Sequence, residues 1–167
     1  MTLLRTLVLL ATTLSVGMGA GVYAVYAHTV MPGLASTDDR TFVGAFQAMD
    51  RAILNPWFLG ASFVGSLLLG GVAVVLCLGR PELPWVVGAV ALHVVLMVVT
   101  MAVNVPMNEA LQAAGPPGAT ADPATVRAGF DAARWEAWNR LRVGLSLISF
   151  ALVAWSLVLN GRADVAG

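Results

Sequence analysis

The 167-residue chain is 59% hydrophobic and only 11% charged, and its mean hydropathy is +0.84. A soluble domain carries about 25% charged residues, so this composition indicates an integral membrane protein. Nine basic residues balance nine acidic ones, which excludes the basic surface of a nucleic-acid-binding protein. The single cysteine, Cys77, lies in an apolar run, so a disulfide framework is excluded as well.

Four stretches of the sequence contain no charged residue, and we expect each to cross a membrane as a helix. They are 6–37, 52–79, 83–108 and 143–161. A helix needs about 20 mainly apolar residues to cross the hydrocarbon core of a bilayer. The predicted fold is therefore all-α, an integral membrane four-helix bundle in which residues 1–167 form one domain. The predicted spans are about 4–28, 56–78, 84–105 and 137–159.

The first span has an alternative interpretation. Arg5, an apolar stretch and the small residues of 24–27 resemble a secretory signal peptide with its cleavage site. The apolar stretch is longer than a usual signal core, however. Gly17 and Gly21 also form a G-x-x-x-G pattern, which favours close packing against another helix. We expect the first helix to be retained, and cleavage is the alternative.

Two long connections, 29–55 and 106–136, follow the first and third spans, whereas a short turn with two prolines joins the second span to the third. Both long connections therefore leave the membrane on the same side. Within 41–54, apolar residues recur at spacings of four, three and four, which predicts a short helix with one apolar face. Asp122 and Pro123 open a second helix, which the sequence allows to run into the fourth span.

The arginines give only weak information on location and orientation. All nine basic residues are arginine, which we interpret as the codon bias of a GC-rich bacterial genome. The expected location is therefore a bacterial cytoplasmic membrane. Arg5 favours a cytoplasmic N-terminus, whereas the larger number of arginines near the long connections favours the opposite orientation.

Polar side chains from distant parts of the sequence fall at the long-connection end of the predicted spans. His28 closes the first span, Asn55 opens the second, and Asn104 and Asn108 close the third. The fourth span begins with Trp135, Trp138, Asn139 and Arg142, whose spacings of three, one and three place them on one helical face. The opposite end of the bundle has no comparable set.

Polar groups at this depth are costly unless they are paired or hydrated, so we expect them to face the bundle interior. The sequence therefore predicts a polar pocket that opens toward the long connections. His28 is the better candidate for proton transfer because a histidine titrates near neutral pH. His93, on a face shared with Asn104 and Asn108, is more simply a hydrogen-bonded bundle histidine. Arg140 is more simply a residue that reaches the headgroups.

Several kinds of cofactor site are disfavoured. Two histidines without a close carboxylate pair argue against a carboxylate-rich di-metal site. The sequence also lacks the motifs of a dinucleotide site or a P-loop. We therefore expect no cofactor and no metal, and a haem or metal held by His28 or His93 is an open alternative.

Four segments, taken in order, resemble the anthrone oxygenase family of small four-helix membrane proteins. The most specific are N-V-P-x-N at 104–108 and W-x-x-W-N-x-x-R at 135–142. They are preceded by V-M-P-G-L at 30–34 and by F-Q-A-M-D at 46–50 with the Asn55-Pro56 pair. The resemblance covers nearly the whole chain. Asp50 departs from it, because an asparagine is expected more often at this position, so the local charge differs here.

The resemblance implies an oxygenase that converts polyketide anthrones to anthraquinones with molecular oxygen and without a conventional organic cofactor. It also implies roles for the polar residues, to be tested below. His28 would be the base, and Trp135 and Trp138 would stack on a flat ring. The oxygen atoms of the reacting substrate would be held by Arg142, Asn104, Asn108 and Asn139. Further substrate contacts would come from Gln47, Asp50, Asn55 and His93.

A second hypothesis belongs to another class. The same pocket would suit a membrane protein that binds a lipid, a quinone or a partner subunit and catalyses nothing. A transporter is a poorer third hypothesis, because the predicted spans contain no carboxylate. The lipid bilayer and a small hydrophobic or aromatic molecule are the expected partners, and a homo-oligomer is open.

Overall fold

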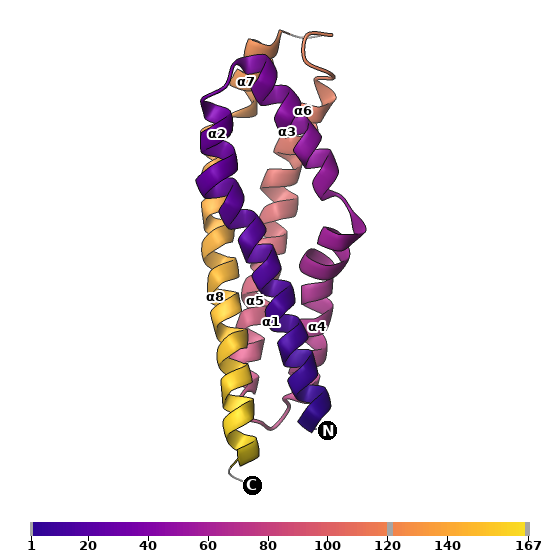
Figure 1. Cartoon of the computed structure of the whole chain (residues 1–167), viewed down its shortest axis with the longest axis vertical. Helices are drawn as coiled ribbons and strands as arrows, with labels where there is room; N and C mark the ends of the chain where they lie inside the picture. Colours follow the sequence, from indigo (N-terminus) through magenta and orange to yellow (C-terminus); the bar gives the residue numbers. More distant parts are fainter. Residues whose placement is uncertain (1, 120–121, 166–167) are drawn as a thin grey trace.

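The structure is a computed structural model that describes residues 2–119 and 122–165. Within these residues the fold is all-helical and contains no strand. Figure 1 shows long helical rods side by side, with short helices gathered at one end and the termini at the other. In chain order the elements are α1 (Thr2–Val25), η1 (Tyr26–Val30), α2 (Met31–Ala35), α3 (Asp39–Ile53), η2 (Trp57–Phe63), α4 (Val64–Leu76), α5 (Leu83–Val99), η3 (Thr100–Asn104), α6 (Val105–Ala113), α7 (Pro123–Phe130) and α8 (Ala132–Val165).

Four helical rods in the described part of the chain are long and apolar enough to cross a membrane. They are Leu3–Ala35, Trp57–Leu76, Leu83–Ala113 and Ala132–Arg162. α1 and α5 both pack against α4 and α8, which closes the bundle. The predicted all-α, four-helix membrane fold is confirmed. Three rods, of 31 to 33 residues, are longer than the predicted spans. They extend about 45–50 Å, whereas the hydrocarbon core is about 30 Å thick.

α1 is packed into the bundle, but only one glycine of its G-x-x-x-G pattern makes a close approach. A Cβ on Gly17 would lie 2.9 Å from the Phe150 ring of α8, whereas a Cβ on Gly21 would meet nothing within 4 Å. Gly17 therefore allows α1 and α8 to approach, and Gly21 faces outward.

The two long connections form a cap over one end of the bundle. The helix predicted for 41–54 is α3, and its N-cap is Asp38, whose carboxylate accepts a hydrogen bond from the Thr41 N–H at 2.9 Å. The hydroxyl and the N–H of Thr41 hold the pKa of Asp38 below its ordinary value. The apolar core of the cap contains Met31, Leu34, Phe42, Val43, Phe46, Leu111, Phe130 and Trp135.

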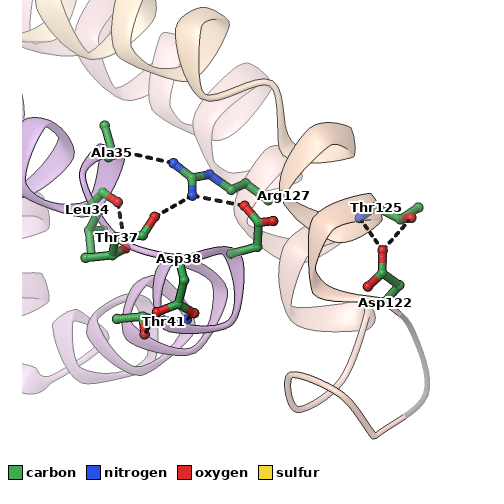
Figure 2. Close-up of polar contacts among 9 residues, drawn as sticks. Leu34, Ala35, Thr37, Asp38, Thr41, Asp122, Thr125 and Arg127 are labelled. Atoms are coloured by element: carbon green, nitrogen blue, oxygen red, sulfur yellow. Dashed lines mark hydrogen bonds and ion pairs between the residues drawn. The ribbon is translucent and has the colours of Figure 1, made fainter.

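Arg127 of α7 ties the two connections together (Figure 2). Its guanidinium donates to the Thr37 carbonyl oxygen at 2.9 Å, to the Ala35 carbonyl oxygen at 3.1 Å and to the Asp39 carboxylate at 3.0 Å. It also lies 4.5 Å from the centre of the Phe42 ring. One side chain thus satisfies the carbonyl groups left free where α2 ends.

α7 does not run into the fourth span, contrary to one expectation from the sequence. The chain breaks at Asp131, whose φ of 49° is left-handed. The Asp131 carboxylate then accepts a hydrogen bond from the Arg134 N–H at 3.2 Å, which caps the start of α8. A non-glycine residue is tolerated in this conformation because aspartate is one of the few that adopt it readily.

Three π-helical segments, η1, η2 and η3, interrupt the rods near the cap. In η1 the Met31 N–H donates to the Tyr26 carbonyl oxygen, and in η3 the Val105 N–H donates to the Thr100 carbonyl oxygen. Each bond spans five residues instead of four. Proline lies just beyond both segments, and a proline ring crowds the carbonyl four residues earlier and cannot donate to it. Widening the turn relieves this conflict without breaking the rod.

The opposite end of the bundle also holds a buried polar cluster, so the expectation that it has no comparable set is wrong. Arg5 donates to the Asn160 side-chain oxygen, and the Asn160 amide donates to the Thr6 hydroxyl at 2.8 Å. Glu82 is fully buried in the turn between α4 and α5, and the Arg80 Nε lies 3.8 Å from its carboxylate. The cluster joins α1 to α8 across most of the sequence.

Candidate functional site

A cavity of about 360 Å³ lies where the rods meet the cap. All three π-helical segments or their neighbouring turns contribute to its wall, together with α1, α3, α6 and α8. The wall is mainly apolar and aromatic, whereas the sequence predicted a polar pocket. The lining residues are Val22, Tyr23, Tyr26, Phe46, Asp50, Ile53, Leu54, Phe58, Leu59, Phe63, Thr100, Met101, Val105, Asn108, Glu109, Trp135, Asn139 and Arg142.

Arg142 supplies a buried positive charge to this wall. Its guanidinium carbon lies 5.0 Å from the centre of the Tyr23 ring and 5.3 Å from that of Trp135. Its Nη2 donates to the Asn139 side-chain oxygen at 2.8 Å, while its buried Nε has no hydrogen-bond partner. Among the described residues no carboxylate forms an ion pair with it. The side chain is only 6% exposed, so a cation without a counter-ion faces an aromatic cavity.

Asn139 holds this arrangement to α1. It is fully buried, and its amide donates to the Tyr23 carbonyl oxygen at 3.0 Å while its oxygen accepts from Arg142. The donor and the acceptor of the amide are therefore both used. The orientation of Arg142 follows from the packing of α8 against α1.

A second polar group in the wall is built around Asp50. The Trp135 Nε1–H donates to the Asn108 side-chain oxygen at 2.8 Å, and the Asn108 amide donates to Asp50 at 2.6 Å. The Gln112 amide donates to the other Asp50 oxygen at 2.8 Å and to the Gln47 carbonyl oxygen at 2.9 Å. Residues from α3, α6 and α8 thus meet in one hydrogen-bonded chain.

The cavity brings together some of the residues that the sequence singled out. Arg142, Asn108, Asn139, Trp135 and Asp50 all line it. On α8, Trp135, Asn139 and Arg142 share one face, as their spacing predicted. Trp138 is half-buried and is not part of the lining. It directly precedes Asn139, and consecutive residues of a helix point about 100° apart.

Neither histidine lines the cavity. His28 in η1 is exposed, and its Nδ1 lies 2.6 Å from the Thr29 hydroxyl. His93 is buried, and its Nε2 lies 2.8 Å from the Ser66 hydroxyl and 3.1 Å from the Phe63 carbonyl oxygen. This arrangement matches the plainer interpretation, a histidine that joins α5 to the η2–α4 rod.

The other three amides selected from the sequence support the wall from behind. Asn104 is buried and its amide donates to the Trp135 carbonyl oxygen at 3.4 Å. Gln47 donates to the Leu111 carbonyl oxygen at 2.8 Å and so joins α3 to α6. Asn55 accepts from the Phe58 N–H at 2.9 Å and caps η2. None of the three lines the cavity.

The aromatic wall and one carboxylate of the cavity were not predicted from the sequence. Tyr23, Tyr26, Phe58 and Phe63 line the cavity, and so does Glu109, which is exposed at its rim. Their sequence signal is weak, since aromatic residues are common in any apolar span. The prolines beside the π-helical segments were the available clue, because π-helical turns are frequent at functional sites.

A more open groove lies beside the cavity, between α1 and η2. The two spaces share Val22, Tyr26, Ile53 and Phe58 in their linings. The groove adds Gly21 and the exposed Trp57 together with Met18, Val25, Asn55 and Ser62. Because these residues belong to membrane-spanning rods or to their ends, the groove faces the bilayer side of the molecule.

The described residues contain no group of three or more His, Cys, Asp or Glu side chains that is arranged to hold a metal ion. The cavity is instead an aromatic enclosure with one cation, two side-chain amides and two carboxylates, of which Glu109 lies at the rim. Such a set suits a planar molecule with an acidic hydrogen and an oxygen that becomes negatively charged.

Comparison with known proteins adds one finding. A family model described as anthrone oxygenase matches residues 55–152. The matched range includes the cavity residues of η2, η3, α6 and α8, whereas α1 and α3 lie before it. No curated protein and no solved structure matches the chain significantly.

Proposed function

The chain belongs to the anthrone oxygenase family, and on this basis we propose that it is a membrane-embedded oxygenase. Its substrate would be an anthrone-like phenol or another flat hydrophobic molecule, bound in the cavity and oxidised by molecular oxygen. The observation that carries the proposal is the buried Arg142 guanidinium, which faces an aromatic cavity without a carboxylate partner.

The chemistry of an anthrone explains why such a site suffices. Loss of a proton from the methylene carbon gives an electron-rich anion whose charge is largely on the carbonyl oxygen. A buried guanidinium stabilises that charge strongly, because the surroundings are poor in water and the donor is already oriented. Arg142 would hold this oxygen, with Asn139 keeping the guanidinium in place, and the aromatic wall would hold the rings.

The reaction with oxygen then balances without another reductant. The anion transfers electrons to oxygen and forms a carbon–oxygen bond, giving a hydroperoxide at the former methylene carbon. Loss of the remaining hydrogen on that carbon, with departure of hydroxide, yields the second carbonyl and one molecule of water. The substrate supplies all the electrons that reduce both oxygen atoms, so the proposed reaction needs no organic cofactor.

The groove between α1 and η2 supports a route from the bilayer. Apolar polycyclic molecules partition into lipid, and the groove shares four lining residues with the cavity. We therefore place substrate entry between Gly21 and Trp57. A location in a bacterial cytoplasmic membrane would be compatible with this route and is part of the proposal.

The test is oxygen consumption by detergent-purified protein with anthrone, for the wild type and for Arg142→Met. Loss of one preorganised donor to a developing oxyanion costs about 100-fold or more in kcat, so the variant should lose nearly all turnover. Arg142→Lys keeps a charge but not the planar fork and should be intermediate. Arg140→Met is the matched control, since Arg140 is exposed and two residues away.

Two results would count against the proposal. Wild-type turnover that is unchanged in Arg142→Met would remove the proposed anion site. Bound haem or stoichiometric metal, found by absorption spectroscopy and metal analysis of the same preparation, would contradict the cofactor-free reaction. A protein that binds anthraquinone tightly yet consumes no oxygen would favour the second hypothesis, a membrane protein that holds a quinone or lipid, for which the lipid-facing groove is the supporting observation.

A further inference from the structure

Asp50 is a carboxylate in the cavity wall whose two oxygens both accept hydrogen bonds. The Asn108 amide donates to one oxygen at 2.6 Å and the Gln112 amide to the other at 2.8 Å. Asp50 is half-buried and comes from α3 in the cap, whereas its two donors come from α6. The carboxylate is thus held in one orientation against the cavity by two groups of a neighbouring helix.

The direction of these hydrogen bonds is fixed by the groups at the two ends of the hydrogen-bonded chain, Trp135 and Arg51. An indole N–H can only donate, so the Trp135 bond at 2.8 Å turns the Asn108 oxygen toward the ring and its amide toward Asp50. A guanidinium can only donate as well, so the Arg51 bond at 2.8 Å turns the Gln112 amide toward Asp50. Asp50 therefore faces donors only, and each oxygen keeps a lone pair that can take a proton.

The other groups in the wall are poor proton acceptors, except for the Glu109 carboxylate at its rim. Arg142 is a cation, and Tyr23 and Tyr26 are phenols whose neutral oxygens are weak bases. Glu109 is exposed at the rim, and no hydrogen bond or ion pair among the described residues fixes its orientation. His28 is exposed outside the lining. A base must lie within hydrogen-bond reach of the proton it removes, so a group in the wall is required.

We propose that Asp50, which stands where the family resemblance leads us to expect asparagine, is the proton acceptor of the reaction in this chain. The inference rests on the oxygenase function proposed above. The carbon–hydrogen bond of the substrate methylene breaks, its electron pair stays on the substrate, and an O–H bond forms at Asp50. The proton returns to the peroxide anion once oxygen has added. Asp50 then removes the second hydrogen as hydroxide departs, and that proton leaves in water. The carboxylate is regenerated, so each cycle starts from the same state.

The charges around the site support this division of roles. Asp50 and Arg142 both line the cavity, which places the base and the cation around one space. A substrate between them would lose its proton toward the carboxylate while its oxygen gains charge toward the guanidinium. The two steps reinforce each other, because stabilising the anion makes the hydrogen more acidic.

The experiment measures proton removal without oxygen. Wild-type protein in detergent is mixed with anthrone in D₂O under nitrogen, and deuterium incorporation at the methylene carbon is followed by mass spectrometry, with the protein-free rate subtracted. Asp50→Asn keeps the size of the side chain and one of its two hydrogen-bond acceptors, and it removes the base. It should lower exchange about 100-fold or more, while the affinity for anthraquinone, which has no such hydrogen, stays unchanged.

Two further variants keep the result interpretable. Asp39→Asn, on the same helix but outside the cavity lining and paired with Arg127, should exchange at the wild-type rate. Asp50→Glu retains a carboxylate and should keep measurable exchange even if Asp50→Asn folds poorly. If both Asp50 variants lose exchange and also lose anthraquinone binding, Asp50 has a structural role and the proposal is overturned.

The outcomes separate this inference from the proposed function. Undiminished exchange in Asp50→Asn overturns the role of Asp50, even where the wild type consumes oxygen with anthrone. Exchange that depends on Asp50 in a protein that consumes no oxygen in air supports the role of Asp50 and contradicts the oxygenase function. A wild type that binds anthraquinone but exchanges no deuterium contradicts both.

Discussion

At the scale of single residues, Trp135 connects Arg142 with Asp50 in the cavity wall. Its ring lies beside the Arg142 guanidinium at 5.3 Å, and its Nε1–H donates to Asn108, which in turn donates to Asp50. The face of the ring and its N–H thus serve different groups. A variant that keeps the ring and removes the N–H separates the two contributions.

Trp135→Phe is that variant. Loss of one donor to a buried amide should lower the free energy of unfolding by about 1 kcal/mol. Asn108 would then be free to reverse its amide, so Asp50 would lose a fixed donor and turnover should fall several-fold. Affinity for anthraquinone should change little. Thermal unfolding and oxygen uptake measure these effects, with Trp155→Phe on the lipid-facing part of the same helix as control. Full turnover in Trp135→Phe would show that the orientation of Asn108 is unimportant.

The polar residues of the site were predictable from the sequence only where a single α-helix carries them. The face of Trp135, Asn139 and Arg142 follows from spacing alone. Asn104 and Asn108 also have matching α-helical phase, yet only Asn108 lines the cavity. η3 ends at Asn104, and the extra residue in its turn shifts the phase of the helix before it relative to the helix after it.

At the scale of elements, the cap depends on how α7 is fastened to the turn between α2 and α3. Figure 2 shows the Arg127 guanidinium reaching carbonyl oxygens at the end of α2 and the carboxylate of Asp39. Hydropathy predicted α3, because its apolar face is regular. The Arg127 contacts join residues about 90 positions apart, and no local sequence pattern predicts them.

Arg127→Met should loosen the cap and leave the membrane bundle intact. The substitution keeps apolar contact with Phe42 but removes charged hydrogen bonds, which contribute about 1–3 kcal/mol in total. Amide hydrogen exchange should therefore accelerate in α3 and α7 and stay unchanged in α4 and α5. Arg134→Met, an exposed residue of α8, is the control. Uniform acceleration through the whole chain would mean that cap and bundle unfold together.

At the scale of the whole molecule, the two ends of the bundle differ in what their buried polar groups do. At the end near the termini (Figure 1), Arg5, Thr6 and Asn160 bond to one another and join α1 to α8. At the cap end, Arg142 and Asp50 face open space within the protein. Hydropathy could predict the spans but not this difference, because pairing between the first and last helices depends on how they pack.

The groove between α1 and η2 is the proposed way into the cavity from the bilayer, and a substitution at Gly21 tests this route. Gly21 lines the groove but not the cavity, and a Cβ there meets no atom within 4 Å. Gly21→Trp should therefore fill the groove while leaving the cavity unchanged. With protein in liposomes, binding and release of anthraquinone should both slow several-fold, whereas the equilibrium affinity should stay the same, because a gate changes rates in both directions.

Gly71→Trp on α4, equally exposed and equally free of neighbours, should bind at the wild-type rate. Equal rates in both variants would mean that the substrate enters through the cap instead. The wall shared by the two spaces, formed by Val22, Tyr26, Ile53 and Phe58, would then not admit the substrate.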